Sequence, residues 1–154
     1  MGLLSSKYDI AVNFICILLF LGMAIFLGLT WQDIPDQVPG HYNAQGEIDR
    51  WTGKGELLIT PIVGWLLFIG VTVIELFPKL WNTGVTVTEE NWPRVYRVIK
   101  NMMGTMKLQL SSIFVFLTIN SALQNELPSW FLPVVLIVVF GSLGYSIVRL
   151  VQIK

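Results

Sequence analysis

Residues 10–32, IAVNFICILLFLGMAIFLGLTWQ, contain no charged side chain. Three further stretches are also free of charge: residues 57–74, 108–125 and 127–148. The hydrocarbon core of a bilayer is about 30 Å thick, so a helix needs about 20 mainly apolar residues to cross it. Backbone polar groups cannot stay unpaired in lipid, so each stretch is expected to form a helix. The sequence therefore predicts an all-α membrane protein with four transmembrane helices, near residues 8–30, 57–78, 104–124 and 129–151.

The composition of the 154 residues excludes a soluble domain. Of these residues, 54% are hydrophobic and only 13% are charged, whereas soluble domains have about 25% charged residues. Ten Lys+Arg balance ten Asp+Glu. The net charge is therefore zero and does not indicate a nucleic-acid partner. The first apolar run is longer than the core of a signal peptide, and we expect it to be retained as a helix. The single cysteine, Cys16, excludes an intramolecular disulfide. Residues 1–154 are therefore predicted to form one polytopic membrane domain.

The basic residues between the predicted helices or near their ends are distributed unevenly between the two sides of the membrane. Eight of them lie in the N-terminal segment, the 79–107 segment and the C-terminal end, whereas the 31–56 loop carries only Arg50 and Lys54. Segments that flank membrane helices and are rich in Lys and Arg tend to stay in the cytoplasm. The sequence therefore predicts that both termini are cytoplasmic and that the 31–56 loop faces outward.

An amphipathic segment, residues 86–107, precedes the third predicted transmembrane helix. Its apolar residues recur at helical spacing from Trp92 to Met106. Arg94, Arg97 and Lys100 lie off that apolar stripe. Such helices are typical of the membrane interface, where basic side chains lie near anionic headgroups. We interpret the three basic residues as a lipid-facing surface, with docking of a cytoplasmic regulator as the alternative.

The third predicted transmembrane helix is the most polar of the four. Gln109, Ser112 and Asn120 fall on one helical face. This pattern is typical of a helix that is buried in the bundle and forms interhelical hydrogen bonds, and a polar lining for a substrate path is the alternative. No ion pair is expected within the membrane, because Glu75 lies at a helix end with Lys79 at i+4, a spacing that suits a surface ion pair. The absence of such a pair favours binding over catalysis or transport.

The 31–56 loop predicts a small hairpin-like cap. Pro35 and Pro39 favour extended backbone, and Ala44-Gln45-Gly46 suits a three-residue hairpin connection with Gly in the left-handed position. The register implied by this connection has three facing pairs: Asn43 with Glu47, Tyr42 with Ile48, and His41 with Asp49. The first and third pairs project from one face of the hairpin, and the apolar second pair projects from the other.

The polar face of this hairpin carries acid–base and metal-ligand side chains, namely His41, Asn43, Glu47 and Asp49. The chain has only one His, however, and it lacks a nucleophile motif and a Gly-rich phosphate loop. Three interpretations stay open: hydrogen bonds that hold the hairpin, binding of a peptide or lipid headgroup, and a catalytic or metal site. No catalytic residue, metal ligand or cofactor is predicted.

The same loop resembles the signature of an uncharacterised bacterial membrane domain. The matching residues are Ile34-Pro35-x-x-Val38-Pro39-x-His41-Tyr42-Asn43-x-x-Gly46-x-x-Asp49, followed by Lys54. This domain is similar to the N-terminal part of SdpI-type immunity proteins, which protect Bacillus from its own sporulation-delaying toxin and relay its presence to a repressor. Those proteins have extra helices beyond this region. The resemblance therefore implies the fold, the bacterial cell membrane and the importance of the loop more directly than it implies immunity.

The leading functional prediction is a non-enzymatic membrane protein that binds or senses a ligand, in an immunity-like or signalling role. Its ligand-binding candidates are His41, Tyr42, Asn43, Glu47, Asp49 and Lys54, with Pro35, Pro39 and Gly46 as the structural motif. The expected partners are membrane lipids, an extracytoplasmic peptide or envelope ligand and a cytoplasmic regulator, and homo-oligomerisation is left open. The competing prediction is a membrane enzyme or transporter accessory subunit that uses His41, Asp49 and the polar third helix.

Overall fold

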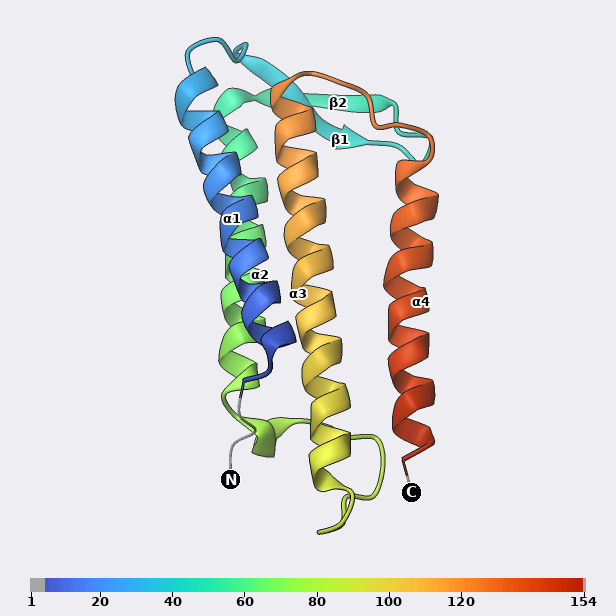
Figure 1. The fold of residues 1–154 in the computed structure, drawn as a ribbon. Helices are drawn as coiled ribbons and strands as arrows, with labels where there is room; N and C mark the ends of the chain where they lie inside the picture. The colour runs from blue at the N-terminus through green and yellow to red at the C-terminus, as the bar shows by residue number, and fades with distance from the viewer. Residues whose placement is uncertain (1–4, 154) are drawn as a thin grey trace.

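The computed structural model describes residues 5–153 as a bundle of four long helices with a two-stranded hairpin across one end (Figure 1). The helices are α1 (Lys7–Thr30), α2 (Ile59–Glu75), α3 (Trp92–Ala122) and α4 (Phe131–Val151). The hairpin consists of β1 (Gln37–Tyr42) and β2 (Ile48–Gly53), and the short helices η1 (Lys54–Leu58) and η2 (Pro78–Leu80) flank α2. The start of α1 and the end of α4 lie at the end of the bundle opposite the hairpin.

Four helices in the described part of the chain are long and apolar enough to cross a membrane, with η1 counted together with α2. The predicted fold class, four membrane helices with a small hairpin in the first loop, is therefore confirmed. Helix α1 begins with a capping box: the Ser6 hydroxyl accepts a hydrogen bond from the Asp9 amide, and the Asp9 carboxylate accepts one from the Ser6 amide. These contacts satisfy amide groups that the first helical turn leaves without partners.

Helix α3 is longer than the third predicted transmembrane helix, because residues 92–107 of the amphipathic segment and that transmembrane helix form one continuous helix of 31 residues. No proline follows Pro93 within this helix, so nothing breaks the backbone ladder. At a rise of 1.5 Å per residue the helix is about 46 Å long, which exceeds the roughly 30 Å of a hydrocarbon core. Residues 92–107 therefore do not form a helix of their own, and they extend α3 at the end away from the hairpin.

The core lies between α1, α2 and α3. Helix α1 buries one face, formed by Val12, Cys16, Phe20, Met23 and Leu27 at spacings of three and four residues. At the centre of the core, the Phe20 ring stacks on Trp65 with ring centroids 4.6 Å apart. Helix α4 packs mainly against α3 and stands apart from α1 and α2 (Figure 1). Much of its apolar surface is consequently exposed, as expected for a helix surrounded by lipid.

Candidate functional site

The hairpin forms with most of the predicted pairs in place. Tyr42 pairs with Ile48, and the Asn43 amide donates to the Glu47 carbonyl oxygen at 2.9 Å. The Asn43 side-chain amide also donates to the Glu47 carboxylate at 2.8 Å. His41 is the exception, because register shifts on both sides of it place it opposite Arg50 in the ladder. Its side chain nevertheless reaches Asp49, with 2.6 Å between Nδ1 and Oδ1.

The His41–Asp49 pair lies at the surface, where the two side chains are 62% and 42% exposed. Water and salt screen an ion pair in such a position, so its contribution to stability is small. The pair fixes the orientation of the imidazole ring. In residues 5–153, no three His, Cys, Asp or Glu side chains lie close enough together to hold a metal ion.

Gly46 joins the hairpin to the loop between α3 and α4. Its φ angle is +91°, in the region that only glycine adopts readily. The Gly46 carbonyl oxygen accepts a hydrogen bond of 2.8 Å from the Leu127 amide. A Cβ atom at Gly46 would lie 2.4 Å from the Leu127 carbonyl oxygen. The turn therefore requires glycine both for its backbone conformation and for its close approach to Leu127.

The C-terminal end of α3 holds the hairpin against the bundle. The Ser121 hydroxyl donates to the Pro39 carbonyl oxygen at 2.6 Å. The Asn120 amide donates to the Tyr42 hydroxyl at 3.2 Å, and the Tyr42 hydroxyl donates to the Asn125 carbonyl oxygen at 3.2 Å. Burial raises the pKa of the Tyr42 phenol above its ordinary value, so this donor stays protonated. These contacts join residues about 80 positions apart, and no local sequence pattern predicts them.

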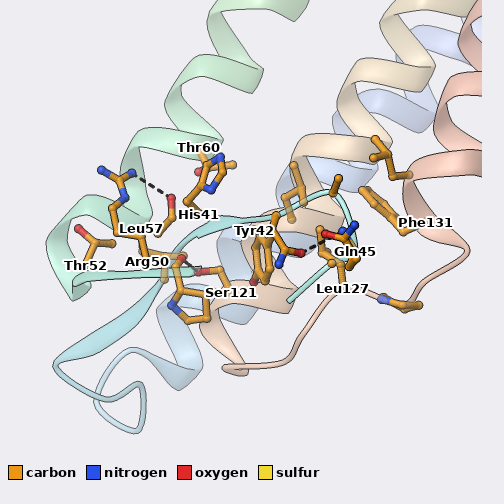
Figure 2. A pocket seen from close by; sticks show the side chains of 18 of the residues that line it. His41, Tyr42, Gln45, Arg50, Thr52, Leu57, Thr60, Ser121, Leu127 and Phe131 are labelled. Carbon is orange, nitrogen blue, oxygen red and sulfur yellow. Dashed lines mark hydrogen bonds between the residues drawn. The ribbon is translucent and has the colours of Figure 1, made fainter. Parts of the chain in front are cut away.

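A cavity of about 480 Å³ lies beneath the hairpin. Its walls come from both strands and the turn of the hairpin, η1, the first turn of α2, the end of α3, the α3–α4 loop and the beginning of α4. Figure 2 shows His41, Tyr42 and Gln45 on the hairpin side, Thr60 on α2 and Phe131 on α4. Ligand pockets in proteins have volumes of about 300–1,000 Å³ and a mainly apolar lining with a few polar groups. This cavity fits that description.

The predicted site residues are divided between the cavity and its surroundings. His41, Tyr42, Asn43, Pro39 and Gly46 line the cavity, whereas Glu47, Asp49, Pro35 and Lys54 are absent from its lining. Glu47 and Asp49 act behind it as hydrogen-bond partners of Asn43 and His41. The Lys54 ammonium donates to the backbone carbonyl oxygens of Trp31 and Ile34 and lies over the Trp31 ring. Lys54 thus connects the end of the 31–56 loop to its beginning.

The polar residues predicted on one face of the third helix have different partners. The Gln109 amide donates to the Ser142 hydroxyl of α4 at 2.9 Å, and Asn120 contacts the hairpin. The Ser112 hydroxyl donates to the Leu108 carbonyl oxygen of its own helix. Gln109 therefore forms the interhelical hydrogen bond that the sequence predicts, between the two helices that pack as a pair.

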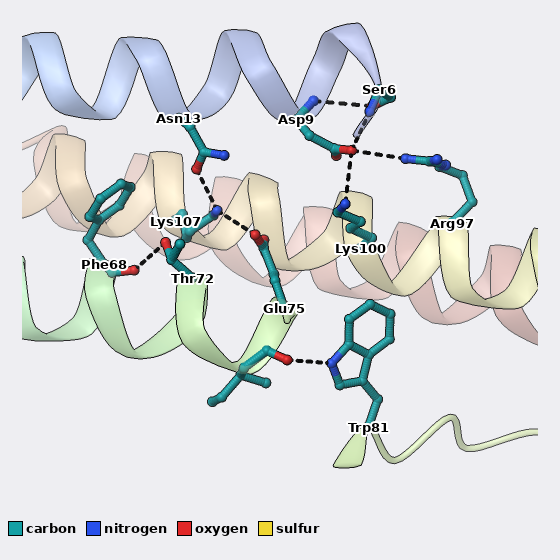
Figure 3. Close-up of polar contacts among 11 residues, drawn as sticks. Ser6, Asp9, Asn13, Phe68, Thr72, Glu75, Trp81, Arg97, Lys100 and Lys107 are labelled. Atoms are coloured by element: carbon teal, nitrogen blue, oxygen red, sulfur yellow. Dashed lines mark hydrogen bonds and ion pairs between the residues drawn. The ribbon is translucent and has the colours of Figure 1, made fainter. Parts of the chain in front are cut away.

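A buried ion pair lies in the bundle near the end of α2, and its acid, Glu75, has a different partner from the predicted one. Figure 3 shows the Lys107 ammonium of α3 between Glu75 of α2 and Asn13 of α1. The distances from Nζ are 2.8 Å to the Glu75 carboxylate and 2.7 Å to the Asn13 side-chain oxygen. The Lys107 side chain is 1% exposed and that of Glu75 is 9% exposed. The predicted surface pair of Glu75 with Lys79 is therefore wrong.

The basic residues at the start of α3 form a second polar cluster around Asp9. The Asp9 carboxylate lies 3.0 Å from the Arg97 guanidinium and 3.4 Å from the Lys100 ammonium (Figure 3). The Lys100 side chain is only 12% exposed, so it faces α1 more than the surroundings of the bundle. Arg94 is exposed and lines a second cavity together with Arg149 of α4. The predicted basic surface is thus divided between an internal ion pair and an exposed part.

Residues 18–64 match the family model described as Domain of unknown function (DUF1648). The chain is similar to this uncharacterised domain over that segment. The segment contains most of α1, the whole hairpin, η1 and the beginning of α2, so it includes the hairpin and α2 sides of the cavity. No curated protein and no solved structure matches the chain.

Proposed function

We propose that the chain is a non-enzymatic membrane protein that binds a ligand in the cavity beneath the hairpin and senses its presence. The observation that carries this proposal is the cavity itself, which brings His41, Tyr42 and Asn43 together with Leu117 and Ser121 of α3. Its volume of about 480 Å³ suits a small ligand or a segment of a larger one. The uneven distribution of Lys and Arg favours this end of the bundle being outside the cytoplasm, which supports a peptide or envelope ligand.

Helix α3 offers a route from such a site to the other side of the membrane. Its C-terminal end lines the cavity at Leu117 and Ser121, and its N-terminal end carries Arg94, Arg97 and Lys100. Because one uninterrupted helix connects the two ends, a shift at the cavity moves the basic end as well. A cytoplasmic regulator would read this movement. The resemblance to SdpI-type proteins supports an immunity-like form of this function, in which the ligand is an envelope-active peptide.

The orientation is tested by cysteine labelling in a Cys16→Ser background. We expect Gln45→Cys, in the turn of the hairpin, to react with a membrane-impermeant maleimide in intact cells. We expect Thr83→Cys, between η2 and α3, to react only after lysis, because the basic residues of its segment favour the cytoplasm. Labelling is measured by the mass shift on a gel. The opposite pattern of labelling would contradict the orientation and with it an outward-facing site.

The binding function is tested by two substitutions with different chemistry at the cavity. His41→Gln keeps a polar side chain but removes acid–base chemistry, which contributes about 10²–10⁴ in rate to an enzyme that depends on it. Leu117→Trp obstructs the cavity and leaves His41 intact. In cells challenged with envelope-active peptides at matched membrane expression, we expect Leu117→Trp to abolish protection and His41→Gln to weaken it less than tenfold. Complete loss in His41→Gln with full function in Leu117→Trp would reject the binding function.

One observation favours the competing class, a membrane enzyme or transporter accessory subunit. Ionisable residues buried within a membrane bundle are often functional, and the Lys107–Glu75 pair is such a site. Lys107 donates both to Glu75 and to Asn13 and thereby ties three helices together. This arrangement supports a structural role. A doubly substituted chain without the pair distinguishes the two roles, as argued in the Discussion.

A further inference from the structure

The cavity beneath the hairpin lies at a boundary between polar and apolar surfaces. On the hairpin side the lining residues include His41, Asn43, Gln45 and Arg50. On the helix side they are mainly apolar and include Leu117, Phe131 and Leu132. The hairpin crosses the end of a bundle whose helices are long and apolar enough to span a membrane. The cavity therefore lies where the headgroups of one membrane leaflet meet the hydrocarbon chains.

The helix side of the cavity carries exposed apolar residues on α2 and α4. Both helices flank α3, and α4 packs mainly on α3. Ile59 on α2 is 57% exposed and Leu132 on α4 is 41% exposed, although both line the cavity. Apolar surface of this kind is unfavourable in water and favourable against hydrocarbon. An occupant with a hydrocarbon chain would cover it, whereas a fully polar occupant would leave it exposed.

The hairpin side offers a group suited to phosphate. The Arg50 guanidinium has five N–H donors, and its bond of 3.2 Å to the Gly40 carbonyl oxygen uses one nitrogen, Nη2. Arginine binds phosphate oxygens in a forked geometry. The other ionisable groups of the lining are Glu56, Tyr42 and His41, and Asp49 holds the Nδ1 atom of His41. Thr52, Thr60 and Ser121 add hydroxyl groups to the lining.

We propose that this cavity binds the phosphate-bearing headgroup of a membrane lipid, with the first part of its hydrocarbon chains lying between α2 and α4. The inference rests on the proposed function and identifies the ligand class. The ligand reaches the site sideways from the leaflet next to the hairpin. Arg50 binds the phosphate, and Ile59, Phe131 and Leu132 contact the chains.

Photolabelling of the full chain in dodecyl maltoside micelles, which contain no phosphate, tests this inference. Two probes carry the same diazirine near the top of an acyl chain: phosphatidylethanolamine, and diacylglycerol without the phosphate. Mass spectrometry of the digested protein locates the label. We expect phosphatidylethanolamine to label the segments around Ile59 and Leu132 about tenfold more than diacylglycerol, the difference that one charge-assisted hydrogen bond confers.

Variants and competitors make the test specific. Arg50→Gln should lower phosphatidylethanolamine labelling about tenfold, whereas Lys79→Gln, which removes an exposed charge at the other end of the bundle, should leave it unchanged. Leu117→Trp should block labelling, and Thr60→Trp, from the opposite wall, gives a second obstruction if the first elutes as aggregate in size-exclusion chromatography. Excess inorganic phosphate should not displace the lipid. Displacement by inorganic phosphate would identify a soluble phosphate ligand and overturn the lipid inference.

The outcomes separate this inference from the proposed function. Equal labelling by both probes, or labelling no stronger at the cavity than at exposed Leu18 of α1, overturns the lipid inference. If Leu117→Trp still abolishes protection in cells, a binding site for another ligand, such as a peptide, stands. If the cavity is labelled as expected but its obstruction leaves the cells protected, the proposed sensing function fails and the lipid site remains.

Discussion

Replacing Lys107 by Met is expected to lower the free energy of unfolding by about 3–5 kcal/mol, the usual cost of removing one partner of a buried ion pair. The Lys107 and Glu75 side chains are 1% and 9% exposed, so little water reaches the carboxylate that the substitution leaves behind. Asn13 also loses the donor to its side-chain oxygen. The loss of stability is measured by thermal unfolding in detergent, monitored by size-exclusion chromatography of the heated samples.

Lys79, four positions after Glu75 in the sequence, provides the matched control. It is exposed, and Lys79→Met is expected to change stability by less than about 0.5 kcal/mol, as most surface substitutions do. Equal losses for the two substitutions would contradict the Lys107–Glu75 pair and restore the pairing of Glu75 with Lys79. The double variant Lys107→Met, Glu75→Leu should recover most of the lost stability, because a buried pair replaced by apolar residues is often neutral.

The double variant also separates the two function classes. If the pair only ties α1, α2 and α3 together, a stable chain without it keeps its cellular function. If the pair carries a proton or an ion, the same chain is stable and inactive. The second outcome would favour the enzyme or transporter class over the binding function that we propose.

Replacing Gly46 by Ala is expected to have the second large effect. A non-glycine residue held at a positive φ angle costs about 1–3 kcal/mol, and the φ of Gly46 is +91°. The added Cβ would also lie 2.4 Å from the Leu127 carbonyl oxygen, too close for contact without movement of the loop. We therefore expect the free energy of unfolding to fall by more than that range. We also expect the turn to detach from Leu127 and the cavity to collapse. Thermal unfolding in detergent measures the first effect, and loss of lipid photolabelling measures the last.

Two other glycines separate the causes of this effect. Gly84 has a φ of +65° with open space around its Cβ position, so Gly84→Ala measures the backbone cost alone. Gly53 has a φ of −68° and open space as well, so Gly53→Ala should be neutral or slightly stabilising. A loss in Gly46→Ala no larger than that in Gly84→Ala would show that the contact with Leu127 does not contribute.

Much of the hairpin is predictable from the sequence because its determinants are local. The position of Gly46 in the turn, the pairing of Tyr42 with Ile48 and the contact of Asn43 with Glu47 depend on residues fewer than ten positions apart. The backbone register around His41 is the part that fails. The register shifts on both sides of His41 are an irregularity in the strand, and Ser121 donates to the Pro39 carbonyl oxygen beside it. Proline has no amide group to donate to the ladder, and the regular pairing of the strand is interrupted next to it.

The basic residues of the amphipathic segment are divided between an ion pair inside the bundle and an exposed part, and this division has a different cause. Helical periodicity correctly separates Arg94, Arg97 and Lys100 from the apolar stripe of the same segment. Periodicity gives no partner for a polar residue, however, and Asp9 lies on another helix. The length of the helix is misjudged because hydropathy marks only the part of α3 that is apolar enough for lipid, whereas backbone hydrogen bonds continue through the basic part.

The sequence by itself determined the four membrane helices, the hairpin turn and the two pairs next to it, Tyr42 with Ile48 and Asn43 with Glu47. Each of these depends on apolar content, on backbone preference or on neighbours within one turn or one strand pair. Only the tertiary structure decided the cavity beneath the hairpin and the partner of Glu75. The cavity needs Tyr42 and Gly46 to meet Asn120 and Leu127, and the ion pair needs Glu75 to meet Lys107, 32 positions away. A buried charge binds whichever opposite charge the helix packing brings within reach, and that packing depends on contacts along the whole bundle.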